Sequence, residues 1–176
     1  METNLTNTTP ADEIVSTAPA TETTGEPVTT QTPTAQVGNT TGELPDGYGD
    51  LMDTAPDGKR FPKPDYIINY SRQLANALTT GTPAMTAAAF NAVFLRDAKK
   101  ALRRGAPVGL MLTTAASFEV QAIKLVAKKK APALLVDMMH TLVPAVIDSE
   151  SYRAAYNHLD SVHTFMLQIE SQKGGE

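Results

Sequence analysis

Five basic side chains fall close together between residues 96 and 104. They are Arg96, Lys99, Lys100, Arg103 and Arg104. At 100° per residue of an α-helix they lie within an arc of about 140°, opposite an apolar stripe that contains Phe90 and Phe94. A helix face of this kind can hold the phosphate groups of a nucleic acid. The spacing therefore predicts a basic face with a role in nucleic-acid binding.

A second basic cluster follows 20 residues later, at Lys124, Lys128, Lys129 and Lys130. Cations stabilise a helix C-terminus by about 0.3–1 kcal/mol each, so both clusters have a purely structural alternative explanation. Nine positive charges between residues 96 and 130 are, however, balanced only by Asp97 and Glu119, which exceeds what capping requires. If the two helices are antiparallel neighbours, the clusters lie at opposite ends; another arrangement would let them merge.

A third basic segment interleaves cations with aromatic rings. Its candidate nucleic-acid-binding residues are Lys59, Arg60, Phe61, Lys63 and Tyr66. Charges for phosphates and rings for bases are what a single strand requires. The alternative is a linker whose Phe61 and Tyr66 anchor on the helical domain.

An acidic and aromatic patch lies just before this segment, between two Pro-Asp-Gly turns. Its candidate partner-docking residues are Tyr48, Asp50, Leu51, Met52 and Asp53. Composition favours a linker here. The alternative is a short motif that becomes ordered on a partner protein or folds back on the basic domain.

Residues for catalysis or metal binding are scarce. The chain has no Cys and three His. We expect His140, on an apolar helix, to be a core imidazole, and His158 and His163 to be surface or helix-packing residues. The last two are five positions apart, so they cannot share a metal as an i, i+4 pair can. No phosphate-binding loop, dinucleotide fingerprint, serine elbow or calcium loop is present. We therefore expect no cofactor, no metal and no enzymatic activity.

Charge is divided unevenly along the chain. Residues 1–58 hold ten acidic and no basic residues, residues 59–130 hold 13 basic and three acidic residues, and the remainder is acidic again. Fifteen of the first 58 residues are Thr, and large apolar residues there are few and isolated. Such a segment buries too little apolar surface to offset its backbone entropy. We therefore predict a long disordered, acidic, Thr/Pro-rich N-terminal arm over residues 1–64.

The rest of the chain predicts an all-α fold, a compact bundle of about five helices over residues 65–172, followed by a flexible C-terminus at 173–176. Apolar spacing, with prolines taken as helix starts, predicts five helices. The first covers residues 65–78, and the second runs from a Thr82 cap, with Pro83 in the first turn, to Arg104. The others cover 107–130, 132–147, and the segment from an Asp148 or Ser149 cap to about Gln172. The segment 107–130 fits one helix, but Gly109 and Thr113-Thr114 allow a split, with a buried strand at 108–112. Pro144 is expected to kink or end its helix.

The location of the protein is also an expectation. No apolar run approaches the roughly 20 residues of a membrane span, and the N-terminus lacks the basic and apolar regions of a signal peptide. We therefore expect a cytoplasmic or intracellular protein.

Three functional hypotheses follow. The first is a non-enzymatic nucleic-acid-binding accessory protein, whose acidic arm modulates binding or recruits a partner protein. The second is a structural or assembly component, of virion or phage type, that self-associates as a homo-oligomer. The third is a helical adaptor that binds an acidic protein or an anionic membrane surface. A membrane surface requires large apolar residues exposed beside the lysines, whereas Phe118 and Leu125 are expected in the core.

Overall fold

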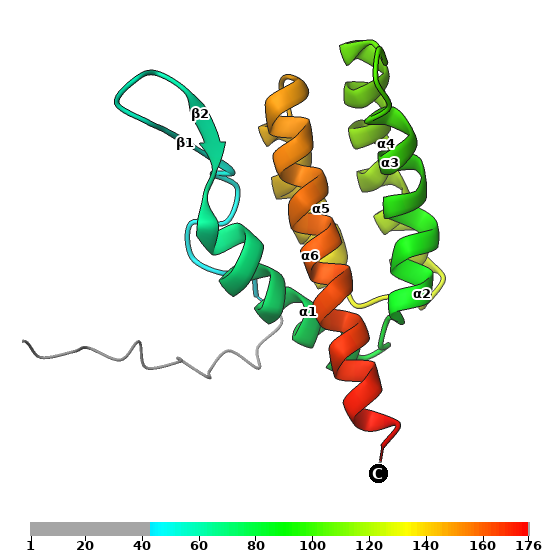
Figure 1. The fold of residues 1–176 in the computed structure, drawn as a ribbon. Helices are drawn as coiled ribbons and strands as arrows, with labels where there is room; N and C mark the ends of the chain where they lie inside the picture. The colour runs from blue at the N-terminus through cyan, green and yellow to red at the C-terminus, as the bar shows by residue number, and fades with distance from the viewer. Residues whose placement is uncertain (1–42, 176) are drawn as a thin grey trace, which may run out of the picture. The chain divides into compact units, whose positions relative to one another are not determined.

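The computed structural model describes residues 43–175, and these residues form the predicted all-α bundle (Figure 1). The predicted arm lies outside the described residues as far as residue 42. The α-helices are α1 (Ser71–Thr80), α2 (Ala87–Phe90), α3 (Arg96–Ala101), α4 (Val108–Ala127), α5 (Leu134–Leu142) and α6 (Ser149–Lys173). Two three-residue strands, β1 (Met52–Thr54) and β2 (Arg60–Pro62), form an antiparallel hairpin.

Two wider turns interrupt the regular helices. The π-helical turn η1 (Tyr66–Tyr70) leads directly into α1, and a second, η2 (Asn91–Leu95), joins α2 to α3. Residues 87–101 are therefore one continuous helix with a change of spacing in its middle. Arg96, Lys99 and Lys100 keep their spacing relative to one another, but their register relative to Phe90 differs from that of a uniform α-helix. The predicted helix end at Arg104 is wrong: α3 ends at Ala101, so Arg103 and Arg104 lie in the turn that follows it.

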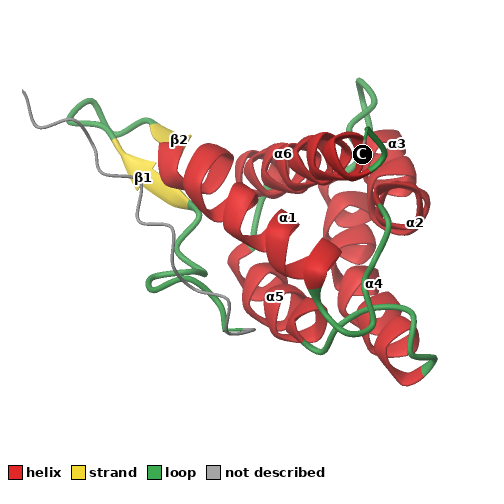
Figure 2. Ribbon diagram, turned by 90° about the horizontal axis from the view of Figure 1, so that it is seen from below, coloured by secondary structure: helices red, strands yellow, loops and turns green. Residues whose placement is uncertain are grey.

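The last helix, α6, lies between the other elements. It packs along α1 on one side and contacts α2, η2 and α4 on the other (Figure 2). Its buried side chains include Tyr152, Leu159, Val162 and Met166. Helix α5 packs on α4 and contributes Leu135, Met138 and Met139 to the same core. The apolar stripes predicted on these helices therefore face a single core, as expected for a bundle.

The start of the second helix differs from the prediction. Thr82 and Pro83 do not begin it; Thr86 is the N-cap, with its hydroxyl accepting from the Ala89 N–H at 3.2 Å. The Met85 N–H instead donates to the Leu78 carbonyl at 2.8 Å, which holds residues 81–86 as a connector against α1. Burial of Met85 favours this connector over an extra helical turn.

Residues 108–127 form one helix, so the split and the strand at 108–112 are wrong. Its last turn closes at Lys129, whose positive φ of 53° allows the Lys130 N–H to donate to the Leu125 carbonyl at 2.9 Å. The next helix, α5, ends before Pro144, which lies in a short 3₁₀ turn, η3 (Val143–Ala145). This is the early end that the proline predicts.

Asp148 caps α6, as predicted. Its carboxylate accepts from the Ser151 N–H at 2.7 Å, while Ser151 Oγ accepts from the Asp148 N–H at 3.0 Å. The Ser151 hydrogen bonds, followed by the Arg60 guanidinium, hold the pKa of Asp148 below its usual range. Arg60 Nη1 lies 2.6 Å from Asp148 Oδ2 and ties β2 to the start of α6.

Asp148→Ala should lower the free energy of unfolding by about 1–2 kcal/mol, because it removes the cap of the central helix. Urea denaturation monitored by circular dichroism measures this. Glu150→Ala, in the same helical turn but exposed, is the control and should change stability by less than about 0.5 kcal/mol. Equal effects of the two substitutions would contradict the capping role.

The part of the predicted arm nearest the bundle is ordered, so the disorder prediction is wrong for residues 43–64. Leu51 is only 2 % exposed, and its carbonyl accepts from the Lys63 N–H at 3.0 Å. The Tyr48 hydroxyl lies 2.8 Å from His158 Nε2 on α6. The structure therefore shows the fold-back alternative for this patch. Periodicity could not reveal it, because these are contacts of single residues, and Tyr48 and His158 are 110 positions apart.

Helix α4 is, among the described residues, the one helix long and apolar enough to cross a membrane by length and composition alone. Thr, Ser and Gly interrupt its apolar residues, which is why the search for apolar runs did not find it. Met111, Ala115, Phe118 and Ala122 on one face of α4 are buried in the bundle. Length and composition alone do not distinguish a membrane-spanning helix from a helix that packs within a folded domain.

Candidate functional site

The basic segment at residues 59–66 is largely occupied by contacts within the domain. Lys59 pairs with Asp57 at 3.0 Å, Arg60 pairs with Asp148, and Lys63 pairs with Asp50. Tyr66 is fully buried, so its predicted role in stacking on a base is wrong; it anchors the segment instead. Phe61 remains partly exposed on the hairpin. This segment is therefore a weak candidate for nucleic-acid contact.

Tyr66 belongs to a buried polar cluster centred on His158. His158 Nδ1 lies 2.9 Å from Ser71 Oγ and 2.8 Å from the Tyr66 carbonyl, while Nε2 contacts the Tyr48 hydroxyl. The Tyr48 and Tyr66 rings stack at 5.2 Å between centroids, and the Gly49 N–H donates to the Tyr66 hydroxyl. Ser71 and His158 are both fully buried, so no substrate can reach this pair.

Burial sets the protonation of this cluster. It lowers the pKa of His158 to about 4, against a smaller opposing effect of the hydrogen bond to the Tyr66 carbonyl. Burial also raises the pKa of Tyr66 to about 12 and that of Tyr48 well above its ordinary value. All three side chains are therefore neutral at pH 7. His158, predicted to be a surface or helix-packing residue, lies on the buried face of α6. Its spacing from Ser151, Ala155 and Val162 was the available signal.

The predicted basic residues line a groove of about 800 Å³ between α6 and residues 88–103, which comprise the helix of residues 87–101 and the start of the turn after it. One wall carries cations and small apolar side chains, and the other is formed by three residues of α6. The lining comprises Ala88, Asn91, Ala92, Leu95, Arg96, Lys99, Lys100, Arg103, Tyr156, Asp160 and His163. The structure thus brings four of the five residues of the first cluster together in one concave surface; Arg104 is exposed just beyond it.

The cations of the groove differ in how they are held. Lys100 Nζ pairs with Asp97 Oδ1 at 2.9 Å, and Arg96 Nε lies 3.8 Å from the same atom. The Lys100 hydrogen bond holds the pKa of Asp97 below its usual range. Lys99 in α3 and Arg103 in the turn after it have no ion-pair partner within residues 43–175. Even with Asp97 and Asp160 counted, the walls keep a net positive charge.

The opposite wall offers two rings beside the cations. Tyr156 is half-buried, and burial raises the pKa of its phenol, with Asp160 adding to the effect. His163 is half-buried one turn beyond Asp160. Cations on one side and flat rings on the other are the elements that bind single-stranded nucleic acid. Sequence analysis did not single out Tyr156 or Asp160, because it could not pair α6 with α3.

The second basic cluster does not join the groove. Helices α3 and α4 are adjacent and joined by a short loop, so the first cluster lies at the start of α4 and Lys124, Lys128, Lys129 and Lys130 lie at its end (Figure 1). A helix of 20 residues is about 30 Å long, which separates the two clusters. All four lysines are exposed and make no ion pair in the described part of the chain.

His140 is exposed, and its prediction as a core imidazole is wrong. Its Nδ1 lies 2.8 Å from Glu119 Oε1, and this contact raises the pKa of His140. The apolar side chains of α5 face the core, and His140 occupies the remaining polar side. No group of three or more His, Asp or Glu side chains suited to a metal ion occurs among residues 43–175.

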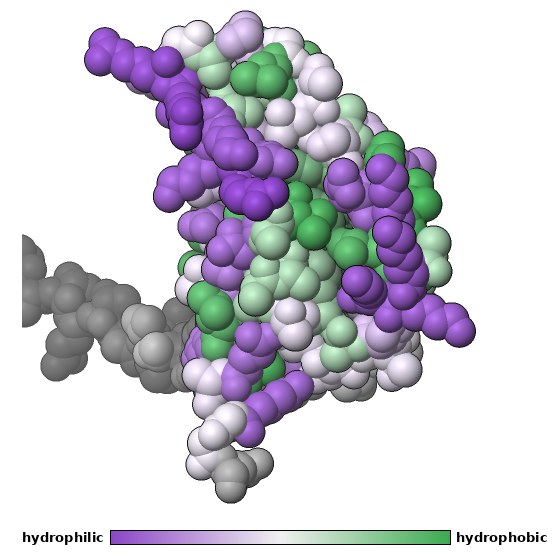
Figure 3. All heavy atoms as spheres, turned by 90° about the vertical axis from the view of Figure 1, so that its right-hand side faces the viewer, coloured by the Kyte–Doolittle hydropathy of each residue, from purple (hydrophilic) through white to green (hydrophobic). Residues whose placement is uncertain are grey.

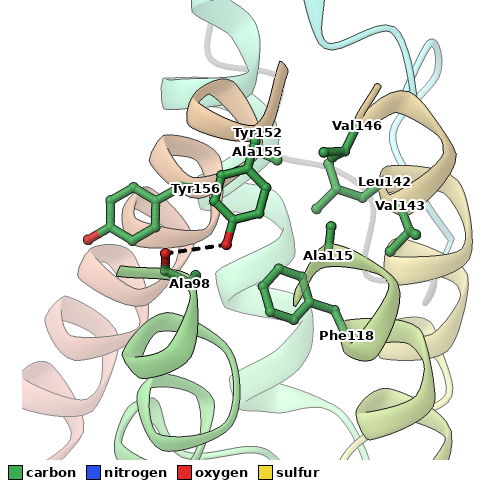
Figure 4. Close-up of a pocket in the computed structure, with 9 residues that line it drawn as sticks. All are labelled: Ala98, Ala115, Phe118, Leu142, Val143, Val146, Tyr152, Ala155 and Tyr156. Carbon is green, nitrogen blue, oxygen red and sulfur yellow. Dashed lines mark hydrogen bonds between the residues drawn. The ribbon is translucent and has the colours of Figure 1, made fainter. Parts of the chain in front are cut away.

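A second, smaller gap lies inside the core, between α3, α4, α5 and α6 (Figure 4). Apolar side chains such as Phe118 and Leu142 line it, and the Tyr152 hydroxyl points across it and donates to the Ala98 carbonyl at 3.3 Å. The gap has no room for a water molecule, so it offers no ligand site. The groove beside α3 is the better candidate site.

No protein-family model matches this chain, and neither a curated protein nor a solved structure is significantly similar to it.

Proposed function

We propose that this protein is a non-enzymatic nucleic-acid-binding protein and that the groove between α3 and α6 holds the sugar-phosphate backbone. The observation that carries the proposal is the placing of Arg96, Lys99, Lys100 and Arg103 along one wall of a groove of about 800 Å³. Cations that are not neutralised by neighbours release counterions from the nucleic acid on binding, which supplies affinity without sequence preference.

Lys99 and Arg103 have no ion-pair partner among the described residues, which supports this proposal over a purely structural role for them. A cation that only stabilises a helix end does not have to line a groove, as these two do. Asp97 pairs with Lys100 and Arg96, so Lys99 and Arg103 are the cations of the groove that it does not neutralise. Tyr156 and His163 across the groove favour a single strand, because an unpaired base has an accessible face for stacking. Lys124 and its neighbours are too distant to share the same site and would contact the backbone farther along a longer strand.

The acidic N-terminal arm is part of the proposal as a modulator. Residues 1–42 contain five acidic and no basic residues, so the arm competes with nucleic acid for the groove or recruits a basic partner protein. Since residues 43–64 pack on the bundle, the arm to be removed in a test ends at residue 42, before the hairpin.

Fluorescence anisotropy with labelled single- and double-stranded oligonucleotides tests the proposal. Full-length protein and residues 43–176 would be compared across a salt series. We expect tighter binding to the single strand, a steep loss of affinity with salt, and tighter binding at low salt without the arm. No binding by either form at low salt would overturn the proposal, and binding that is insensitive to salt would exclude the groove cations as its basis.

A further inference from the structure

The outer face of α4 is apolar and uncovered within the described domain. Leu110, Val120 and Ile123 lie on the side turned away from the core and are each between 48 and 50 % exposed, while Met111, Ala115, Phe118 and Ala122 on the other side are buried. Figure 3 shows the side of the domain that carries α3 and α4, with hydrophobic surface between groups of hydrophilic side chains. A helix with this exposure is a candidate for contact with a partner.

This face also lacks charge for most of its length. From Val108 to Ile123 the one charged residue is Glu119, which lies at the edge of the face and pairs with His140. The hydroxyls on the helix are already satisfied. Thr113 donates to the Gly109 carbonyl at 2.8 Å, Thr114 donates to that of Leu110 at 2.7 Å, and Ser117 donates to that of Thr114 at 2.7 Å. Moving this face out of water therefore leaves no unpaired hydroxyl.

Cations lie at both ends of the apolar face. Arg103 and Arg104 precede α4, and Lys124 and Lys128 lie on its exposed side near the end, followed by Lys129 and Lys130. An apolar strip with basic residues at each end is complementary to a bilayer that carries anionic headgroups. We propose that α4 docks this domain onto an anionic lipid surface, lying in the headgroup region with Val120 and Ile123 inserted.

Charge favours a lipid surface over a second copy of the chain. In a two-fold pairing of α4 helices, either the lysine clusters meet each other or they meet Arg103 and Arg104 of the other copy, so like charges oppose in both directions. An anionic headgroup layer attracts both clusters, and the buried side of α4 keeps the helix on the surface of the bilayer instead of across it.

The test is flotation of the full-length protein with phosphatidylcholine vesicles and with vesicles containing 30 % phosphatidylserine. We expect binding to the anionic vesicles only. Val120→Glu should weaken it about tenfold or more, because it puts a negative charge where a side chain enters the headgroups. Leu167→Glu on α6 is the matched control: Leu167 is 49 % exposed against 50 % for Val120, and the charge change is the same. Circular dichroism of both variants verifies folding.

Three outcomes would overturn the inference. They are no binding to anionic vesicles, equal binding by the Val120→Glu and Leu167→Glu variants, and a dimer in light scattering that the Val120 substitution dissociates. The first two exclude insertion of the face, and the third assigns it to a second copy. The inference is independent of the nucleic-acid proposal, since Val120→Glu should leave oligonucleotide affinity in the groove unchanged.

Discussion

Reversing the charge of Lys99 and Arg103 together, as Lys99→Glu with Arg103→Glu, should weaken oligonucleotide binding about a hundredfold at low salt. These two cations line the groove and have no ion-pair partner among the described residues, so they are the ones free to contact phosphates. Each phosphate contact contributes about one unit to the slope of log affinity against log salt, so the slope should fall by about two. Anisotropy titrations at several salt concentrations measure both quantities.

A second charge-reversed variant distinguishes binding in the groove from general electrostatic attraction of nucleic acid to the basic surface. Lys124→Glu with Lys128→Glu makes the same change in net charge at the far end of α4, at residues that are also exposed. We expect a loss of tenfold or less from this pair. A loss as large as that of the Lys99 and Arg103 variant would mean that the whole basic surface attracts nucleic acid and that the groove has no special role.

Lowering the pH from 6.5 to below 4 should cost the domain about 3 kcal/mol of stability through His158 alone. Burial lowers the pKa of this imidazole to about 4 in the folded protein, whereas it titrates near 6.5 when unfolded. The unfolded state therefore takes up the proton first as the pH falls. The stabilisation is complete above pH 6.5 and is lost progressively down to the folded pKa.

Other titratable groups change the stability in the opposite direction or in a different pH range. His140 has a raised pKa and is 75 % exposed at its side chain, so its small contribution is present below pH 6.5 and is lost as the pH rises through its folded pKa. Hydrogen bonds lower the pKa of Asp97 and of Asp148, so their stabilisation is present above the ordinary pKa of a carboxyl group and is lost only at more acidic pH. The change in folding stability between pH 4 and 6.5 is therefore due mainly to His158.

Urea denaturation at several pH values, with NMR titration of the histidines, measures the effect. His158→Gln should cost about 2 kcal/mol at pH 7, because partners of the imidazole lose a hydrogen bond, but its stability should be nearly level between pH 6.5 and 4. His140→Gln should keep the slope of the native protein. A His158 resonance that titrates near 6.5 in the folded protein would contradict the predicted slope, whatever the variants show.

Sequence patterns predicted the elements that depend on local spacing. The apolar stripes of α4 and α6, the Asp148 cap and the stop before Pro144 are all properties of residues within one or two helical turns. The basic face of α3 is of the same kind, and four of its five residues line the groove. The groove itself could not be predicted, because its other wall is α6 and the spacing of residues 96–104 says nothing of where α6 lies.

The predictions that failed concern residues with distant partners. Tyr48, Leu51 and Tyr66 look like isolated residues in a polar segment. Yet Tyr48 and Tyr66 contact His158 of α6, and Leu51 is buried. His140 is exposed and not in the core, and of the two predicted environments for His158, surface or helix packing, the buried one is correct. A histidine fits either environment, and the deciding contacts with Ser71 and with Glu119 come from other helices.

The wider turn at Asn91–Leu95 sets the rotational phase between the two ends of one helix. A π-helical turn holds about one residue more than an α-helical turn, so the residues after it are out of step with a uniform α-helix. If the same residues formed a uniform α-helix, α3 would be rotated by about 100° relative to Phe90. Lys99 and Arg103 would then turn away from Tyr156 and His163. The width of one turn therefore contributes to the groove as much as the charge of its residues does.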